Sequence, residues 1–349
     1  MKVLDADQLR RICIDILRAV GALEDEAKIV ADSLIKANLR GVDSHGVIRL
    51  PVYVNRVKHK TIVPGAPFTV IREAPSAALV DGGSGFGQVV AVKAMKLAIE
   101  KARRTGVGAV SVRNTNHFGM AAYYGLIALQ NDMIGIITCN TSPWVAPWGG
   151  RIPMLGTNPV CVAIPSGGEI PIILDMATSA TARGKIEKAA IEGKSIPEGW
   201  AINKEGKPTT DPVAALKGAL LPFGGPKGYC LSFIIDILSG ALADAACGKS
   251  VVSLYPEDHK CNIGQFFLAL NVNAFIPIED FKAKVDKFVH EIKTCPLAHE
   301  YTEILIPGEI EYRFEQKRLR EGIPLSDETW QGLERLCKEL KINISSFTS

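Results

Sequence analysis

Residues 77–139 read AALVDGGSGFGQVVAVKAMKLAIEKARRTGVGAVSVRNTNHFGMAAYYGLIALQNDMIGIITC. Strands that alternate with helices are typical of an α/β unit in which helices cover a buried sheet. The apolar pattern predicts strands at 77–80, 108–112 and 134–139, and helices at 89–104 and 121–130. This stretch therefore sets the expected fold class, which is α/β.

Helices are predicted on both sides of this unit. Between Asp5 and Arg40 apolar residues recur every three or four positions, which indicates two amphipathic helices. A third helix is expected over 50–60, and the tail from Glu309 returns to charged helical sequence. We therefore expect a discontinuous helical domain of residues 1–75 and 307–349, and an α/β domain of residues 76–306.

The rest of the α/β domain is punctuated by proline and glycine, which mark loops and turns. Its patterns predict strands at 160–164, 172–174, 265–270 and 303–306, helices after Pro226 and over 278–292, and an exposed loop at 197–211.

Composition excludes several classes of function. The 349 residues include 40 basic and 37 acidic side chains, a net charge of +3. This balance is unlike that of proteins that bind nucleic acid or anionic membranes through phosphate neutralisation. The eight cysteines form no CxxC pair, which argues against a zinc site and favours buried free thiols. Asp5 and Asp7 interrupt the segment where a signal peptide needs apolar residues, so we expect a cytoplasmic protein without a metal.

A glycine-rich turn, Gly83-Ser84-Gly85-Phe86-Gly87, follows a predicted strand and opens a predicted helix. It superficially resembles the dinucleotide fingerprint G-x-G-x-x-G. The last glycine comes too early, and the region about twenty residues on is basic where the fingerprint needs an acidic residue. A tight strand-to-helix turn is the favoured interpretation.

Two of the six histidines are candidates for proton transfer. His45 lies at the end of a helix, and His117 lies just after a strand, where α/β sheets place ligand-binding groups. Each is a candidate catalytic group or a loop-bracing group, because imidazole titrates near neutral pH. The other histidines are expected to be solvated: His59, His259, His290 and His299.

Three charged residues are further candidates for binding a ligand. Arg49, four residues after His45, could bind a carboxylate in bidentate fashion. Asp175 ends a strand, so it could accept a ribose hydroxyl or cap the following helix, and capping is favoured. Lys227, flanked by glycines at the start of an apolar helix, could hold a phosphate. No GxSxG or HExxH motif is present, which argues against a serine hydrolase and a zinc peptidase.

Nearly the whole chain resembles the malate/L-lactate dehydrogenase family, which includes L-sulfolactate and ureidoglycolate dehydrogenases and diketogulonate reductase. The resemblance is carried by nine segments in order: Ser44-His45-Gly46 with Arg49, Gly87-Gln88-Val89, Asn116-His117-Phe118-Gly119, Pro147-Trp148-Gly149-Gly150, Gly156-Thr157-Asn158-Pro159, Asp175-Met176-Ala177-Thr178, Pro208-Thr209-Thr210-Asp211-Pro212, Gly224-Gly225-Pro226-Lys227-Gly228-Tyr229 and Ile304-Leu305-Ile306-Pro307-Gly308-Glu309. It implies a mixed sheet unlike the Rossmann fold, use of NAD or NADP, and a homodimer with the cofactor near the subunit interface.

The resemblance also implies roles for individual residues. It makes His45 and His117 the catalytic acid/base candidates and places Ser44 and Arg49 beside the substrate. The implied cofactor contacts are Thr141, Asp175, Met176, Ala177, Lys227, Gly308 and Glu309.

The implied reaction transfers a hydride between the nicotinamide and a small anionic 2-hydroxy acid or 2-keto acid of the malate, sulfolactate or lactate type. The segments 114–117 and 123–124 favour the malate and sulfolactate branch. A second anionic group on the substrate would need a further cation, for which Arg113, Arg183 and Lys185 are available. The alternatives are a reductase of diketogulonate or of cyclic imines such as Δ1-piperideine-2-carboxylate, and a non-catalytic binder with the same fold.

Overall fold

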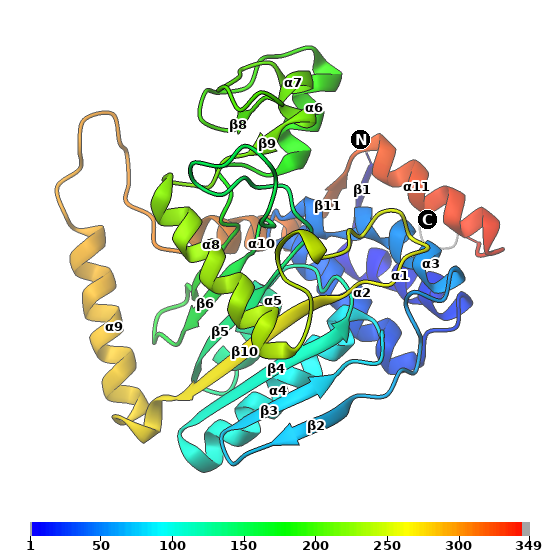
Figure 1. Ribbon diagram of the computed structural model, residues 1–349. Coiled ribbons are helices and arrows are strands. Elements are labelled where there is room, and N and C mark those ends of the chain that lie inside the picture. Colours follow the sequence, from blue (N-terminus) through cyan, green and yellow to red (C-terminus); the bar gives the residue numbers. More distant parts are fainter. Residues whose placement is uncertain (1, 344–349) are drawn as a thin grey trace.

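The computed structural model describes residues 2–343 and is built around a seven-stranded sheet (Figure 1). The strand order is β2–β3–β4–β10–β5–β6–β7. The strands are β2 (Thr69–Glu73), β3 (Ala77–Asp81), β4 (Val107–Thr115), β10 (Ile263–Asn271), β5 (Met133–Cys139), β6 (Val160–Ile164) and β7 (Ile172–Met176). Strands β3 and β4 run parallel and the other neighbours antiparallel, so the predicted mixed α/β sheet is confirmed.

One edge of this sheet collects the carboxyl ends of β3, β4, β5 and β7. Strand β10 pairs antiparallel with both β4 and β5, and Gln265 lies opposite Val112 on one side and Cys139 on the other. The loops after β4, β5 and β7 therefore leave the sheet on the same side. Ligands of open α/β sheets bind at the carboxyl ends of strands, and these loops carry most of the candidate residues.

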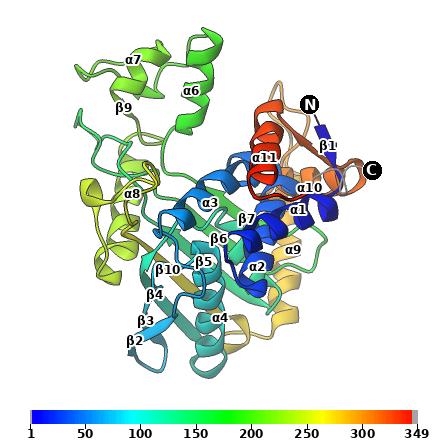
Figure 2. The ribbon, with the colours of Figure 1, turned by 90° about the vertical axis from the view of Figure 1, so that its right-hand side faces the viewer.

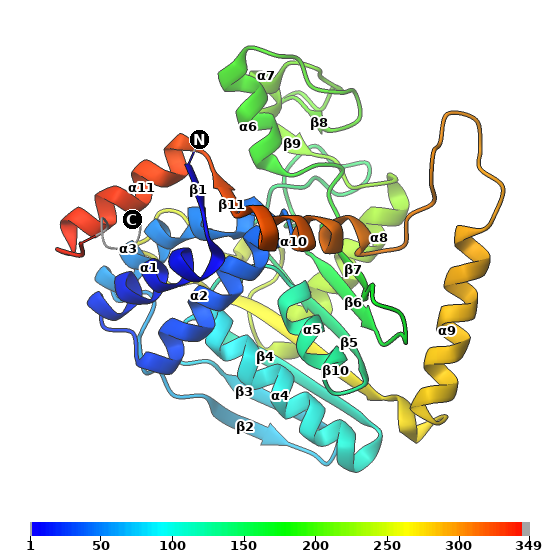
Figure 3. The ribbon, with the colours of Figure 1, turned by 180° about the vertical axis from the view of Figure 1, so that it is seen from behind.

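Helices cover both faces of the sheet. Helices α4 (Gly87–Thr105) and α5 (Ala122–Leu129) lie on one face, and α8 (Pro226–Ser239) lies on the other (Figures 2 and 3). The apolar faces of α4 and α5 pack with β4, β5 and β10 into one buried cluster. Helix α4 approaches β4 closely at Gly108, where an added Cβ would lie 1.9 Å from the carbonyl oxygen of Ala98.

We expect Gly108→Ala to destabilise the protein. The new methyl group meets backbone atoms of α4, so helix and strand must separate. Overpacking of this kind costs about 1–3 kcal/mol, which lowers Tm by about 1–4 °C in a thermal melt of a chain of this length. The matched control is Gly184→Ala, at a helical position where an added Cβ meets nothing within 4 Å. A melt in which Gly108→Ala is as stable as the control would contradict the close contact between α4 and β4.

The two ends of the chain pack together. Strand β1 (Lys2–Leu4) pairs antiparallel with β11 (Ile323–Leu325). A second apolar cluster joins the N-terminal helices to the C-terminal one; these helices are α1 (Ala6–Ala19), α2 (Glu24–Leu39), α3 (Leu50–Lys58) and α11 (Asp327–Glu339). Helix α10 (Glu309–Glu321) contacts α2 through Glu315, which pairs with Lys36 and Arg40. The exact domain boundaries stay a prediction.

A small lobe projects from the rest of the molecule (Figure 1). It contains α6 (Arg183–Glu192), β8 (Ala201–Ile202), α7 (Pro212–Lys217) and β9 (Ala219–Leu220), and it has an apolar cluster of its own. The sequence predicted only an exposed loop at 197–211. Strands of two residues carry no readable alternation, which explains why the lobe was missed.

The predicted strand at 303–306 is wrong. The segment has no ladder partner, and its neighbour Pro307 accepts a single backbone hydrogen bond, from Ile173 N at 3.0 Å. It follows α9 (Ile278–Lys293), which stands away from the sheet (Figure 3) and has no buried residue. The expectation of buried thiols also fails in part, because Cys230, Cys247 and Cys295 are exposed.

Candidate functional site

The fold brings His45 and His117 side by side. His45 ends the short helix η1 (Asp43–His45), whereas His117 follows β4. Their imidazole rings stack with centroids 5.5 Å apart and an interplanar angle of 20°. Both residues are half-buried, whereas His59, His259, His290 and His299 are exposed as expected. The two histidines singled out by sequence therefore form one pair.

Each histidine of the pair is held at Nδ1 by a hydroxyl group. Tyr53 Oη lies 2.7 Å from Nδ1 of His117, and Ser44 Oγ lies 2.9 Å from Nδ1 of His45. Neither Nε2 forms a hydrogen bond with any residue that the structure describes. The pair thus presents two anchored imidazoles, each with one nitrogen free for a ligand.

Both imidazoles are neutral at pH 7. Burial and the charge of Arg49 lower the pKa of His45 to about 4. Burial lowers the pKa of His117 well below its usual value, and repulsion from a protonated His45 and from the charges of Arg49 and Arg56 lowers it further. Neutral imidazoles can accept a proton, so the site is prepared for general-base chemistry.

Arg49 lies beside the histidine pair, on the short helix η2 (Val47–Arg49). Its Nε donates to the carbonyl oxygen of Ser44 at 2.7 Å, and one terminal nitrogen lies 3.5 Å from Tyr255 Oη. No carboxylate of the described chain pairs with it. The guanidinium is fixed in place with its charge uncompensated, as an anion-binding group requires.

The segment 252–261 contributes Tyr255 to the site, and sequence reasoning missed it. This segment is held by Arg56, which is fully buried and donates to the carbonyl oxygens of Leu254 and His259 at 3.0 and 2.8 Å. Arg56 also donates to Asn116 Oδ1 at 3.3 Å. It thereby joins the Tyr255 segment to the residue that precedes His117.

The glycine-rich turn 83–87 supports the site by packing against the backbone of Asn116 and His117. Gly83 and Ser84 have φ values of +59° in the left-handed region. A Cβ on Gly87 would lie 2.2 Å from the carbonyl oxygen of Asn116 and 2.3 Å from that of His117. Gly87 lets α4 begin directly against the backbone of Asn116 and His117. The role of the glycine-rich turn is therefore structural.

The candidate cofactor residues lie at the carboxyl ends of β5 and β7, at the same sheet edge as His117: Thr141 and Ala177 follow the two strands, and Asp175 and Met176 are the last two residues of β7. Thr141 Oγ1 accepts from Thr157 N at 2.9 Å. Thr178, the residue after Ala177, donates its backbone N–H to Thr157 O at 2.9 Å. These bonds join the two loops, so the structure brings these four candidates together.

Asp175 caps a helix, but not the one that follows it. Its Oδ2 accepts from the backbone N–H of Ala122, the first residue of α5, at 2.7 Å. The helix that follows, α6, begins after Ala182 and has no side-chain cap. The protein packed around Asp175 raises the pKa of its carboxyl to about 6, although the residue keeps a solvent-exposed surface. Only Oδ2 is bonded to Ala122, and the residue is exposed to solvent. The other carboxylate oxygen, Oδ1, is therefore available to a ligand.

Lys227 lies near these loops at the second residue of α8. Phe223 N donates to Thr178 O at 3.1 Å, which places the turn before α8 beside the end of β7. Gly224 and Gly225 make this turn with φ values of +55° and +64°. The Lys227 side chain is exposed and forms no ion pair or hydrogen bond within residues 2–343. A free ammonium at a helix N-terminus is suited to a phosphate.

The last two candidates, Gly308 and Glu309, lie against the start of β7. Gly308 has φ +89°, and a Cβ there would lie 3.0 Å from Ile173 N. Glu309 is buried, and its carboxylate binds Lys293 at 2.6 Å, Arg313 at 2.6 Å and Ile306 N at 3.1 Å. These partners give Glu309 a structural role at the start of α10.

Three further cations could bind a second anionic group of the substrate, but each is ion-paired within the protein or lies in the projecting lobe. Arg113 pairs with Asp81 and Asp244. Arg183 pairs with Glu187 at 2.9 Å and stacks 3.7 Å from the ring centroid of Trp144. Lys185 lies on the same helix, α6.

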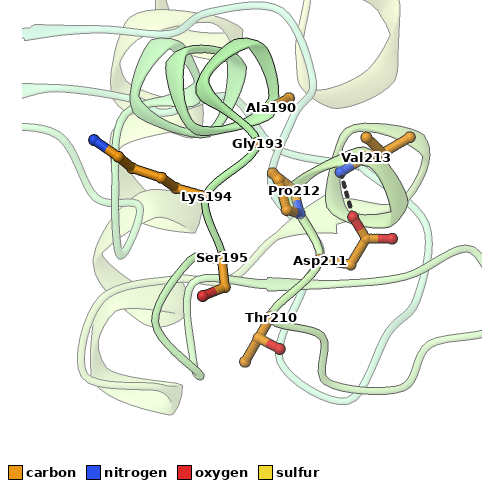
Figure 4. Close-up of a pocket in the computed structure, with 8 residues that line it drawn as sticks. All are labelled: Ala190, Gly193, Lys194, Ser195, Thr210, Asp211, Pro212 and Val213. Atoms are coloured by element: carbon orange, nitrogen blue, oxygen red, sulfur yellow. Dashed lines mark hydrogen bonds between the residues drawn. The ribbon is translucent and has the colours of Figure 1, made fainter.

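A surface cavity of about 360 Å³ lies in the projecting lobe, between the end of α6 and the start of α7 (Figure 4). Lys194 and Ser195 line one side, and Thr210 and Asp211 line the other. None of the predicted site residues lines it. Within the described chain no cluster of metal-ligating side chains is found, and no helix has the length and apolar character needed to cross a membrane.

Comparisons with known proteins place this arrangement in context. The family model described as malate/L-lactate dehydrogenase matches residues 4–334. The L-sulfolactate dehydrogenase of Methanothermobacter thermautotrophicus is 47% identical over 96% of each chain. The malate/(S)-sulfolactate dehydrogenase of Methanothermus fervidus is 45% identical over 98% of this chain and 99% of its own. The solved sulfolactate dehydrogenase of Methanocaldococcus jannaschii superposes with a TM-score of 0.95 at 44% identity, covering 100% of both chains.

Proposed function

The chain belongs to the malate/L-lactate dehydrogenase family, and from this premise we propose that it oxidises a small 2-hydroxy acid to the 2-keto acid, and catalyses the reverse reaction, with NAD or NADP. The observation that carries the proposal is the neutral pair His45 and His117 beside the uncompensated charge of Arg49. The retained pair argues against a non-catalytic binder with the same fold.

The chain's own residues supply the binding and the proton transfer. Arg49 binds the substrate carboxylate, with Ser44 beside it, and fixes the hydroxyl carbon near the imidazoles. One histidine of the pair takes the hydroxyl proton and the other orients the oxygen. A nicotinamide cofactor, when bound, would supply the hydride acceptor. The substrate carboxylate also compensates Arg49, which raises the pKa values of both histidines and strengthens them as bases.

The cofactor fits the residues at the sheet edge. A dinucleotide needs a cation for its phosphates and hydroxyl-binding groups for its ribose. Lys227 supplies an unpaired ammonium on a glycine turn, and Asp175 supplies a free carboxylate oxygen, with Thr141, Met176 and Ala177 close by. Gly308 lies against the start of β7, the strand that carries Asp175 and Met176. Glu309 supports the turn at Gly308 through its ion pairs.

We expect Lys227→Met to weaken cofactor binding about 10-fold, because one charge-assisted phosphate contact is lost. The measurement is a fluorescence titration with NADH and with NADPH. Lys204→Met, an exposed lysine of the projecting lobe, is the matched control and binds normally. Equal affinities for the two variants would remove Lys227 from the cofactor site.

The pH profile of oxidation follows from the lowered histidine pKa values. A base must be unprotonated, so kcat/KM for the hydroxy acid falls as pH drops through its pKa. Because this pKa lies below the usual value, wild-type kcat/KM stays on its plateau down to below pH 6. Arg49→Met removes a positive charge that disfavours the imidazolium, which raises the pKa and moves the acidic limb to higher pH. An unmoved limb would show that Arg49 does not act on the catalytic base.

A substrate-by-cofactor matrix tests the activity itself. We propose the malate and sulfolactate branch, since two relatives that match this chain over nearly their whole length are named L-sulfolactate dehydrogenase and malate/(S)-sulfolactate dehydrogenase. Two residues of the segments 114–117 and 123–124 that suggested this branch make structural contacts: Asn114 bonds to Asp81 and Ser84, and Tyr123 bonds to Asp32. Absorbance at 340 nm with both cofactors should show turnover of sulfopyruvate or oxaloacetate. Preference for Δ1-piperideine-2-carboxylate or diketogulonate would favour those reductases instead.

We also propose that the enzyme works as a cytoplasmic homodimer. Large apolar side chains are exposed on α8, α9 and α10, including Phe233, Ile234, Phe288 and Phe314. Large apolar side chains left exposed in a single chain are typical of residues that a subunit interface covers. Light scattering should therefore give twice the mass of one chain, and a monomer at micromolar concentration would exclude the dimer.

A further inference from the structure

The loop that carries Ser44, His45 and Arg49 has little internal structure to hold it. It consists of the two single-turn helices η1 and η2, neither of which has a side-chain cap at its N-terminus. Hydrogen bonds of such 3₁₀ turns have poorer geometry than those of an α-helix. The position of this segment, called here the 43–49 loop, therefore depends on residues outside it.

The first outside contact is Asn38, which lies near the end of α2 and is 2% exposed. Its Nδ2 donates to Asp43 Oδ1 at 2.6 Å, and its Oδ1 accepts from Val47 N at 2.9 Å. A Cβ on Gly46 would lie 2.2 Å from Asn38 Oδ1, so the glycine lets the loop close over the amide. Asn38 thus bonds to the loop on both sides of His45.

The second outside contact is Arg318, which lies on α10 and is separated from Asp43 by 275 positions of sequence. Its Nη1 and Nη2 donate to Asp43 Oδ1 and Oδ2 at 2.7 and 3.0 Å. Nη1 also donates to the backbone carbonyl oxygen of Asn38. The Arg318 side chain is only 12% exposed. Most surface ion pairs contribute little to stability, but a bidentate pair within a network is an exception.

Helix α10 is fixed at two further points, so a rigid element presents Arg318 to the loop. Glu315 pairs with Lys36 and Arg40 of α2, at 2.6 and 3.1 Å. Gly308, the residue before the first turn of α10, lies against the start of β7. The helix therefore extends from the start of β7 along α2 toward the 43–49 loop (Figure 3).

Asp43 is linked to the reactive groups through Ser44. Ser44 Oγ bonds to Nδ1 of His45 at 2.9 Å, and the Ser44 carbonyl oxygen accepts from Arg49 Nε at 2.7 Å. One residue therefore contacts both the imidazole and the guanidinium, and its backbone continues directly from Asp43. A displacement of Asp43 moves Ser44 and changes the orientation of both groups.

We propose that Arg318 is a positioning residue of the substrate site, which holds Asp43 and thereby fixes His45 and Arg49. The inference rests on the proposed function, and it makes a helix from the C-terminal part of the chain necessary for substrate binding. The bonds that join the cofactor loops at Thr141 and Ala177 do not involve α10. The expected effect is therefore confined to the hydroxy acid.

The first test is the split between substrate and cofactor in Arg318→Met. The variant should lower kcat/KM for L-malate or L-sulfolactate at least ~10-fold, because the charge-assisted bonds that fix the loop are lost. The Kd for NADH or NADPH, measured by fluorescence titration, should stay within about twofold of the wild-type value. Arg318→Lys should recover part of the loss, since an ammonium cannot bind both carboxylate oxygens in the same geometry.

Two control variants separate positioning from a general loss of stability. Arg320→Met, at an exposed arginine of the same helix, should keep the wild-type kcat/KM. Glu315→Gln breaks the other ion pairs of α10 and should lower Tm at least as far as Arg318→Met, yet keep kcat/KM close to wild type. Equal losses of kcat/KM in Glu315→Gln and Arg318→Met would overturn the proposal, because docking of α10 alone would then explain them.

The second test needs no turnover. Amide hydrogen exchange of the full-length protein without substrate, followed by mass spectrometry, reports how readily the 43–49 loop opens. Arg318→Met should speed exchange of residues 44–49 at least ~10-fold and leave the segment around Thr141 unchanged. In an Asp43→Ala background the same substitution should have little further effect, because its partner is gone.

Unchanged exchange of the 43–49 loop in Arg318→Met would overturn the positioning role even if the enzyme oxidises hydroxy acids. Conversely, absence of turnover by the wild type with every hydroxy acid would refute the proposed function, while hydrogen exchange would still report on the loop. The two failures are therefore distinguishable.

Discussion

Replacing His117 with alanine is expected to lower kcat for 2-hydroxy acid oxidation by at least ~100-fold, the low end for loss of a general base. His117 follows β4 at the sheet edge, its ring stacks on His45, and its Nδ1 is held by Tyr53. The imidazole is neutral at pH 7 because burial lowers its pKa, and the neighbouring guanidinium groups of Arg49 and Arg56 lower it further. Single-turnover rates measured at 340 nm separate this chemical step from product release.

The matched control for His117→Ala is His59→Ala, an exposed histidine at the end of α3. It should turn over at the wild-type rate. His45→Ala is also expected to slow turnover, because this residue shares the stack and its Nδ1 is held by Ser44. If neither His45→Ala nor His117→Ala slows the single turnover, the assignment of the pair is wrong.

Replacing Arg49 with methionine is expected to raise KM for the hydroxy acid about 100-fold, since a charge-assisted hydrogen bond to a bound carboxylate contributes about 1.5–3 kcal/mol. The guanidinium is held by the Ser44 carbonyl and by Tyr255, and no carboxylate of the described chain competes for it. Arg49→Lys should recover only part of the affinity, because an ammonium cannot reproduce the bidentate contact.

Steady-state kinetics with saturating cofactor measure this effect. Arg72→Met, an exposed arginine on the edge strand β2, is the matched control and keeps the wild-type KM. A KM of Arg49→Met within about twofold of the wild-type value would mean that the carboxylate binds elsewhere.

Most of the central fold could be predicted because its elements are long and strongly patterned. Helix α4 and strands β4 and β5 form the buried cluster, and their apolar periodicity is readable from sequence. The segment 303–306 misled because its three consecutive apolar side chains, at 304–306, are typical of a buried strand, yet no neighbouring strand pairs with them. The projecting lobe was missed because its strands are two residues long and gain their order from tertiary contacts.

The histidine pair could be predicted because each residue lies in a polar loop motif. Its supporting residues could not. Tyr53 and Arg56 lie on a helix face that is typical of ordinary core packing, and only the folded chain brings them to His117 and Asn116. Tyr255 reaches Arg49 across 206 positions of sequence, a contact that no local pattern reports. The resemblance implied a cofactor contact at Glu309. It could not show that the Glu309 carboxylate forms ion pairs with Lys293 and Arg313.

We expect hydride to move from the hydroxyl-bearing carbon of a 2-hydroxy acid to a nicotinamide bound at this site. The most direct measurement is mass spectrometry of the reduced cofactor after turnover of substrate deuterated at C2, such as L-sulfolactate or L-malate. We expect one deuterium in each reduced cofactor molecule and none from substrate deuterated at C3. Unlabelled reduced cofactor, or no reduction of NAD or NADP with any hydroxy acid, would contradict it.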